Sequence, residues 1–126
     1  MSEKPAIEIS GAGPAGLAAA LAVSAAGRHA LVYEKRTDVG GRFHGDFQGL
    51  ENWTTKGDVL EEFAALGIEA GFEYVPVCEI VCFDHEGAGR TLRSRQPLFY
   101  LVQRGDQPGN LDYALKQQAI AAGVEI

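Results

Sequence analysis

Cysteine, methionine and tryptophan are scarce in this chain of 126 residues, which contains two, one and one of them. The two cysteines, Cys78 and Cys82, are spaced C-x-x-x-C within a β-branched run, which matches neither a zinc site nor a redox motif. We therefore predict that both are structural core residues. The histidines His29, His44 and His85 are too dispersed along the chain to indicate a metal site.

Basic residues are also few, since 11 Lys and Arg stand against 17 Asp and Glu, with a formal net charge of −6. Proteins that bind nucleic acid usually carry a basic face, so this balance argues against a nucleic-acid partner. Residues 11–27 form an apolar stretch, but it is interrupted by glycines and too short to span a bilayer, which takes about 20 residues. We therefore expect no transmembrane segment and predict a cytoplasmic location.

A glycine-rich motif, Gly11-Ala12-Gly13-Pro14-Ala15-Gly16, lies between two segments of opposite character. An apolar run within residues 5–10 precedes it, an alanine-rich helical pattern over 14–26 follows it, and a second β-like run covers 29–34. This order predicts one βαβ unit with a parallel strand pair. Such a unit, with these glycines at the strand-to-helix turn, is typical of a dinucleotide-binding fold.

Each residue of the motif has a physical role in that fold. Gly11 would allow the tight turn, Gly13 would let the backbone approach a pyrophosphate, and Gly16 would let helix and strand pack closely. Pro14 suits the first helical turn, where its missing N–H would be unpaired anyway. Glu34 ends the second strand 23 residues after Gly11, where a ribose-binding acid is expected.

The remainder of the chain predicts a mixed architecture. Residues 35–55 are rich in glycine and charge and predict a long ordered loop, and residues 56–66 predict a helix. Residues 72–104 predict an inserted antiparallel hairpin or meander, with one strand over 75–83 and a Gly-rich turn at 85–89. A helix beginning near Leu111 and a third parallel strand at 124–126 complete the pattern. We predict one α/β domain over residues 1–126, Rossmann-like with a three-stranded parallel sheet, and incomplete because it stops in a strand.

The segment from Glu34 to Arg42, with its Gly40-Gly41-Arg42 turn, resembles the N-terminus of FAD-dependent oxidoreductases of the glutathione-reductase-like superfamily. The later order of a β-rich excursion, Arg104, a Leu-Asp-x-x-Leu helix and a Gly-Val-Glu-Ile strand is similar to the geranylgeranyl reductase and aromatic hydroxylase branch. Asp38 departs from the amine-oxidase pattern, which has an arginine there, and so does Gly45, where that pattern often has Ser or Thr.

The resemblance implies FAD as cofactor and assigns a role to each site residue. Glu34 would bind the adenosine ribose, Lys35 would lie at the adenine edge, and Arg42 and Arg104 would flank the pyrophosphate or ribityl chain. An arginine suits this task because its guanidinium keeps its charge and forks onto phosphate oxygens. The pyrophosphate would be lined by Gly11, Gly13, Pro14, Ala15 and Gly16, and Gly41 would belong to the adjoining turn.

The same resemblance implies that this chain would bind only part of the cofactor of the complete enzyme. A later Gly-Asp segment that contacts the cofactor in such flavoproteins is not among these residues, so the chain alone would hold the adenosine half of FAD. The substrate would be a small molecule or lipid-like, and NAD(P)H is a candidate reductant. Two alternatives remain open: an NAD-dependent dehydrogenase domain, which would show regular β–α alternation after Glu34, and a non-catalytic fragment that binds adenine nucleotides.

Overall fold

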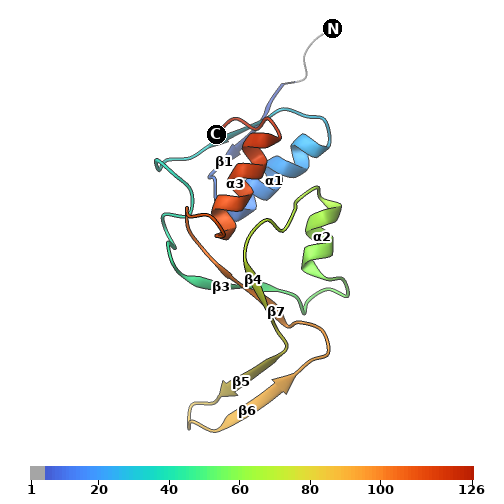
Figure 1. Ribbon diagram of the computed structural model, residues 1–126, viewed down its shortest axis with the longest axis vertical. Helices are drawn as coiled ribbons and strands as arrows, with labels where there is room; N and C mark the ends of the chain where they lie inside the picture. The colour runs from blue at the N-terminus through green and yellow to red at the C-terminus, as the bar shows by residue number, and fades with distance from the viewer. Residues whose placement is uncertain (1–4) are drawn as a thin grey trace.

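The computed structural model describes residues 5–126 and begins with the βαβ unit that the glycine motif predicts (Figure 1). Strand β1 (Ile7–Ser10) leads into helix α1 (Pro14–Ala25), and strand β2 (Ala30–Tyr33) returns parallel to β1. The helix contacts both strands. It ends at Ala25 and is followed by Gly27, whose positive φ of 68° gives the chain a left-handed turn into β2.

The parallel sheet has two strands rather than the three that the sequence predicts. Helix α3 (Leu111–Ala121) packs beside α1, and the chain after it approaches β2 as expected. It forms only a single parallel bridge, between Leu31 and Glu125, although the amide of Val32 donates a 2.8 Å hydrogen bond to the carbonyl of Glu125. The third strand is therefore reduced to one bridge within the described residues.

One face of the β1–β2 pair packs against the helices, and the other face is open. Ala30 and Val32 are buried beneath the helices, whereas Glu8 and Tyr33 are exposed on the opposite face. The hydroxyl of Tyr33 donates a 3.0 Å hydrogen bond to Glu8. This explains how a strand in a Rossmann-like unit carries a glutamate at its centre.

A second, antiparallel sheet of three strands, ordered β3-β7-β4, lies beside the helical layer (Figure 1). Strand β3 (Phe47–Glu51) falls inside the segment that the sequence predicts as loop, so that prediction is wrong for these residues. Gly49, which favoured a loop, sits opposite strand β7 (Phe99–Gln103), where a Cβ would lie 2.9 Å from the ring of Phe99. The glycine is therefore required by cross-strand packing.

Helix α2 (Val59–Ala65) is shorter than the predicted 56–66 and begins after Asp58. The Asp58 carboxylate accepts a 2.9 Å hydrogen bond from the amide of Leu60 and thus caps the helix. Its other oxygen accepts a 2.6 Å hydrogen bond from the hydroxyl of Tyr100 on β7. This contact fixes the start of α2 to the antiparallel sheet.

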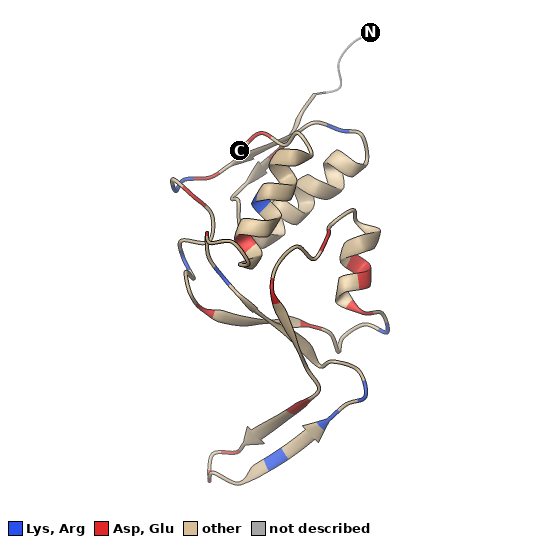
Figure 2. Ribbon diagram, in the orientation of Figure 1, with Lys and Arg blue, Asp and Glu red and all other residues tan. Residues whose placement is uncertain are grey.

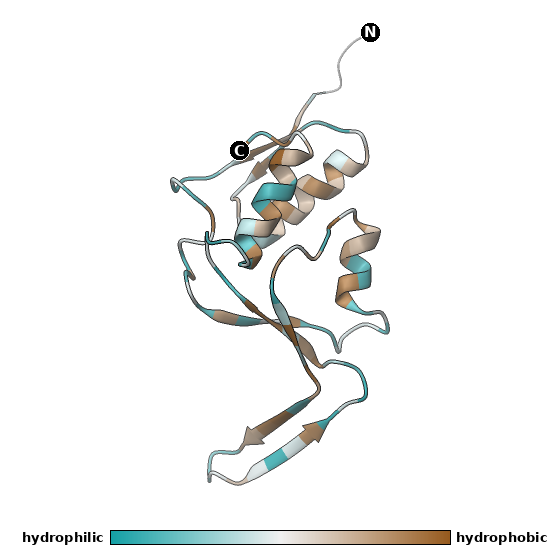
Figure 3. Ribbon diagram, viewed as in Figure 1, coloured by the Kyte–Doolittle hydropathy of each residue, from teal (hydrophilic) through white to brown (hydrophobic). Residues whose placement is uncertain are grey.

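The apolar run predicted as one strand over 75–83 is divided at Cys78. Strand β4 (Tyr74–Val77) pairs with β7, whereas β5 (Glu79–Phe83) pairs with β6 (Gly89–Arg93) in a separate hairpin that projects from the body (Figure 1). The hairpin contains hydrophobic residues, coloured brown in Figure 3, and its Val81, Phe83 and Leu92 are exposed, Phe83 to 71%. Both cysteines are exposed too, so the prediction of core cysteines is wrong.

The hydrophobic core lies between the helices and the sheets. Its members come from every layer except the β5–β6 hairpin, and the largest fully buried apolar ones are Leu17, Ile68, Leu115, Val32 and Val102. None of the helices in the described part of the chain is long and apolar enough to cross a membrane.

Candidate functional site

The glycine loop takes the geometry that a strand-to-helix turn requires. Gly11 has a positive φ of 92°, a region that side chains disfavour, and its amide donates a 2.7 Å hydrogen bond to the carbonyl of Tyr33 at the end of β2. A Cβ on Gly16 would lie only 1.9 Å from the carbonyl oxygen of Gly11. The close crossing of α1 and the β1 turn therefore depends on Gly16, as the sequence predicts.

The start of α1 is open for a ligand. Gly13 is the N-cap residue and supplies no side-chain cap, the first turn holds no acidic residue, and Pro14 begins the helix. A Cβ built on Gly13 would meet nothing within 4 Å. Free amides at a helix start carry a partial positive charge, so this end of α1 is suited to an anion.

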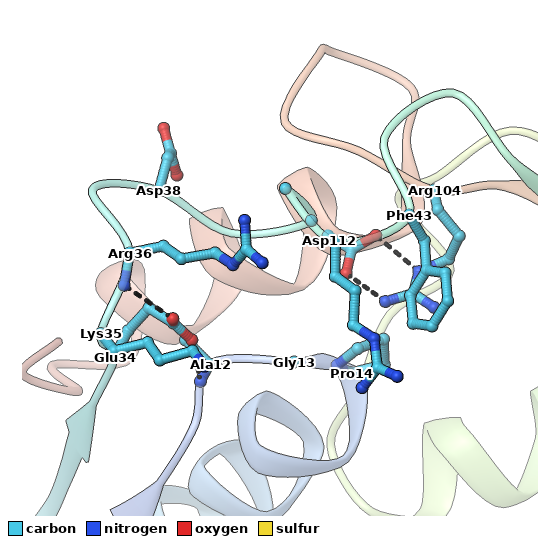
Figure 4. A pocket seen from close by; sticks show the side chains of 13 residues that line it. Ala12, Gly13, Pro14, Glu34, Lys35, Arg36, Asp38, Phe43, Arg104 and Asp112 are labelled. Carbon is cyan, nitrogen blue, oxygen red and sulfur yellow. Dashed lines mark hydrogen bonds and ion pairs between the residues drawn. The ribbon is translucent and has the colours of Figure 1, made fainter.

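Glu34 ties the glycine loop to the chain after β2. One carboxylate oxygen accepts a 2.9 Å hydrogen bond from the amide of Ala12, and the other accepts a 2.9 Å bond from the amide of Arg36 (Figure 4). These backbone donors, Arg36 first and Ala12 second, lower the pKa of Glu34 below its ordinary value. The side chain is therefore ionised at neutral pH.

A cavity of about 370 Å³ opens between the glycine loop, the end of β2 and the start of α3 (Figure 4). A second hollow of about 510 Å³ adjoins it and shares Glu34 and Lys35. Figure 2 shows charges of both signs along the loop between β2 and β3, which forms one wall. The first cavity is lined by Ala12, Gly13, Pro14, Glu34, Lys35, Arg36, Asp38, Gly40, Gly41, Arg42, Phe43, Arg104 and Asp112.

Arg104 occupies the wall of this cavity in a buried ion pair. Its Nε and one terminal nitrogen donate 2.7 Å hydrogen bonds to the two carboxylate oxygens of Asp112 (Figure 4). Its other terminal nitrogen donates a 2.7 Å bond to Gln48. The guanidinium carbon also lies 5.1 Å from the ring centre of Phe43, and that of Arg42 lies 5.0 Å from the same ring. One aromatic ring thus holds two cations at the cavity.

The opposite wall is fixed by a second ion pair. The Nζ of Lys116 on α3 donates a 2.6 Å hydrogen bond to Asp38, which also accepts a bond from the amide of Val39. The ammonium of Lys116 lowers the pKa of Asp38, and the Val39 amide lowers it further. Asp38, where the amine-oxidase pattern has an arginine, therefore anchors the loop to α3.

The structure brings most of the predicted site residues together. Gly13, Pro14, Glu34, Lys35, Gly41, Arg42 and Arg104 line the first cavity, and Gly11 lines the adjoining hollow. Ala15 and Gly16 line neither of these two. The binding roles assigned to these residues stay predictions.

Several residues of the cavity wall were not predicted as site residues from the sequence. Asp112 stands in the Leu-Asp-x-x-Leu helix start and Gly40 in the Gly-Gly-Arg turn, so both lay in motifs already noticed. Phe43 and Arg36 had no such signal beyond their place in the loop. Among residues 5–126, no cluster of three or more His, Cys, Asp or Glu side chains is arranged to hold a metal ion.

The first part of the chain matches a known protein family. Residues 9–55 match the model of a family described as an NAD(P)-binding Rossmann-like domain. No curated protein sequence matches the chain significantly. The matched segment covers the glycine loop, α1, β2 and the loop that follows, which is where the sequence predicts the nucleotide site.

Solved structures resemble nearly the whole chain. A geranylgeranyl bacteriochlorophyll reductase-like protein from Thermoplasma acidophilum is 21% identical, with a TM-score of 0.64 over 96% of this chain and 30% of its own. The tetrameric form of 2-methyl-3-hydroxypyridine-5-carboxylic acid oxygenase is 23% identical, with a TM-score of 0.66 over 99% of this chain and 31% of its own. A flavin-dependent brominase is 23% identical, with a TM-score of 0.58 over 94% of this chain and 27% of its own.

These similarities concern the fold, because the identities are low. The chain spans roughly 30% of the length of these structures. They confirm, at the level of the fold, the predicted likeness to a geranylgeranyl reductase-like protein, an oxygenase and a flavin-dependent enzyme.

Proposed function

We propose that this chain is the cofactor-binding part of a flavin-dependent oxidoreductase and that it binds the ADP moiety of FAD. The observation that carries the proposal is the cavity at the uncapped start of α1, with open space over Gly13 and Glu34 on its rim. Its likeness in fold to a reductase-like protein, an oxygenase and a flavin-dependent brominase supports the same conclusion. By their names the first is reductase-like, the second is an oxygenase and the third depends on a flavin.

The residues of the cavity fit such a ligand. The pyrophosphate would lie at the start of α1, where helix amides and Arg42 supply positive charge. Each carboxylate oxygen of Glu34 accepts one backbone N–H and keeps further acceptor capacity, so ribose hydroxyls can still donate to it. Lys35 borders both hollows and would lie at the adenine edge.

When bound, the flavin supplies the redox chemistry, and the residues of this chain bind and orient it. We propose a small-molecule or lipid-like substrate, NAD(P)H as reductant and a cytoplasmic setting for the complete enzyme. The three similar proteins are named for different reactions, so the fold that they share is compatible with more than one substrate class.

An NAD(P)-binding domain is the second candidate, because the matching family model carries that description and the same glycines would serve it. That candidate predicts regular β–α alternation after Glu34. The chain instead continues into β3 and an antiparallel sheet, which favours the flavin proposal.

Titration calorimetry of the 126-residue chain with FAD, ADP and NADH tests the proposal. We expect FAD and ADP to bind with similar affinity, since the chain would contact mainly their shared ADP moiety, and Glu34→Gln to weaken both. Glu61→Gln, an exposed position on α2, is the matched control and should change neither. Tighter binding of NADH than of FAD would instead support the NAD(P) candidate, and failure of ADP to bind would refute both.

A further inference from the structure

Asp112 is a charged side chain in a place where charge is expensive. It is fully buried, with 0% exposure, at the start of α3. Its carboxylate accepts two hydrogen bonds from Arg104 and a third, of 3.0 Å, from the amide of Gly105. A buried ion pair of this kind is weak evidence for stability, because well-packed apolar residues often serve the fold as well. The pair therefore calls for an explanation other than folding.

The partner of Asp112 is held in one orientation from several sides. Arg104 is 8% exposed and forks onto Asp112, and Gln48 accepts from the remaining terminal nitrogen. A guanidinium has five N–H donors, and these three bonds leave two of them for a ligand. Arg104 lines the cavity wall, so those donors belong to a side chain that borders the proposed pyrophosphate position.

The backbone around Arg104 is fixed as well. A Cβ on Gly40 would lie 2.6 Å from the Cα of Gly105, so the loop that carries Arg42 and Phe43 crosses directly over this segment. Phe43 then stands against both guanidinium groups. In the described part of the chain, no carboxylate forms an ion pair with Arg42. A ligand anion in the cavity would give Arg42 a partner of opposite charge.

We propose that Asp112, assisted by Gln48, is a positioning residue that holds Arg104 ready for the pyrophosphate of the bound nucleotide. This inference rests on the proposed function. An arginine side chain that is already ordered loses little conformational entropy when the anion binds, so the ion pair raises affinity for the charged part of the ligand. It makes no difference to the adenosine part, which lies at Glu34 and Lys35.

The test compares ADP with adenosine, since only ADP carries the pyrophosphate. We expect Asp112→Asn to weaken ADP binding about tenfold and to leave adenosine binding unchanged, as loss of a hydrogen bond to a charged group would do. Arg104→Lys, which keeps the charge but loses the fork, should have the same effect. The double variant should be no weaker than either single one, because both act through one guanidinium.

Two further variants keep the experiment decisive. Gln48→Met removes one support of Arg104 without unpairing a buried charge, and we expect it to weaken ADP binding a few-fold should Asp112→Asn fail to fold. Asp58→Asn removes a hydrogen-bonded carboxylate that lines neither hollow, so it should lower stability and leave the ratio of ADP to adenosine affinity unchanged.

Equal ADP affinity in wild type and in folded Asp112→Asn and Gln48→Met would overturn the positioning role and leave the proposed function standing. A parallel loss of ADP and adenosine binding would overturn it too, because it would indicate a structural defect. Wild-type protein that binds neither ligand would refute the proposed function and this inference together.

Discussion

Gly13 and Gly16 belong to one motif but should respond to alanine in opposite ways. At Gly16 the new Cβ would lie 1.9 Å from the carbonyl oxygen and 3.1 Å from the carbonyl carbon of Gly11. Both are backbone atoms, so the loop itself must shift by about 1 Å or more within a packed interior. At Gly13 the Cβ would meet nothing within 4 Å, and the φ of −77° is one that alanine adopts readily.

The balance of energies differs accordingly. Alanine within a helix gains about 0.5–1 kcal/mol over glycine, whereas forcing atoms into a packed site costs about 1–3 kcal/mol. For Gly16→Ala the clash with backbone should dominate, and we expect a net loss of about 1–2 kcal/mol. For Gly13→Ala a weaker N-cap offsets the lower entropy of the unfolded chain, so stability should stay within about 0.5 kcal/mol.

Urea unfolding followed by circular dichroism measures both effects, and ADP titration of the folded variants adds the functional contrast. Gly13→Ala should fold normally and bind ADP more weakly, because its methyl group would occupy the space where the phosphate approaches α1. Gly16→Ala with wild-type stability would refute the packing argument. Gly13→Ala with wild-type ADP affinity would show that the open space over the helix start is not where the nucleotide binds.

Three other predictions use titration and exposure. The Arg36 and Ala12 amides lower the pKa of Glu34, so the stability that its carboxylate contributes is complete above the unfolded pKa near 4.5 and is lost as pH falls through the folded pKa. Glu34→Gln should therefore lose less stability in acid than the wild type when urea unfolding is measured across pH. The same dependence of stability on pH in both proteins would contradict this. The hydrogen bond to the Asp58 carboxylate, together with burial, raises the pKa of Tyr100 to about 12. The stability that this hydrogen bond contributes is therefore complete below pH 10 and is lost as pH rises toward 12. Ultraviolet titration should show a late-titrating tyrosine that Asp58→Asn shifts to lower pH, and a titration curve unchanged by Asp58→Asn would contradict this. Phe83→Ser on the projecting hairpin should change the free energy of unfolding by under about 0.5 kcal/mol, and a larger loss would mean that the hairpin packs against something.

The first part of the fold could be predicted from sequence because its signals are local. The spacing of Gly11, Gly13 and Gly16 and the apolar periods around them sufficed for β1, α1 and β2, and α3 followed from a similar pattern. Most of the predicted nucleotide residues came together because they lie in this unit or directly after it. Local pattern and final structure agree here, because each glycine of the motif is required within the loop and helix start where it stands.

Pairing over long sequence distances was beyond such signals. Strand β3 exists because Phe47–Glu51 pairs with β7, about fifty residues later. Gly49 within it is a residue type typical of loops, so the sequence predicted a loop there. The run containing Cys78 looked like one strand, but its two halves join different partners. The cysteines were expected in the core because apolar runs usually lie there, and only the projecting hairpin reveals their exposure.

The residues that orient Arg104 could not be predicted from the sequence for the same reason. Arg104 was named from its motif, but its bonds to Asp112 and Gln48 arise only when the fold brings α3 and β3 each into contact with Arg104. A sequence can suggest that an arginine binds an anion without showing what orients it. Buried partners of this kind are fixed by tertiary structure, so they escape any reading of spacing alone.

Several contacts that hold the cavity walls need no ligand. Glu34 fixes the glycine loop to the chain after β2, Lys116 fixes Asp38 to α3, and Asp112 fixes Arg104 to the opposite wall. A site assembled in this way should change little in backbone position when a nucleotide enters, because its loops are already ordered. Little of the binding free energy is then spent on ordering the loop. Substitutions at these anchoring residues should therefore lower the affinity for the nucleotide without a large change in the backbone structure.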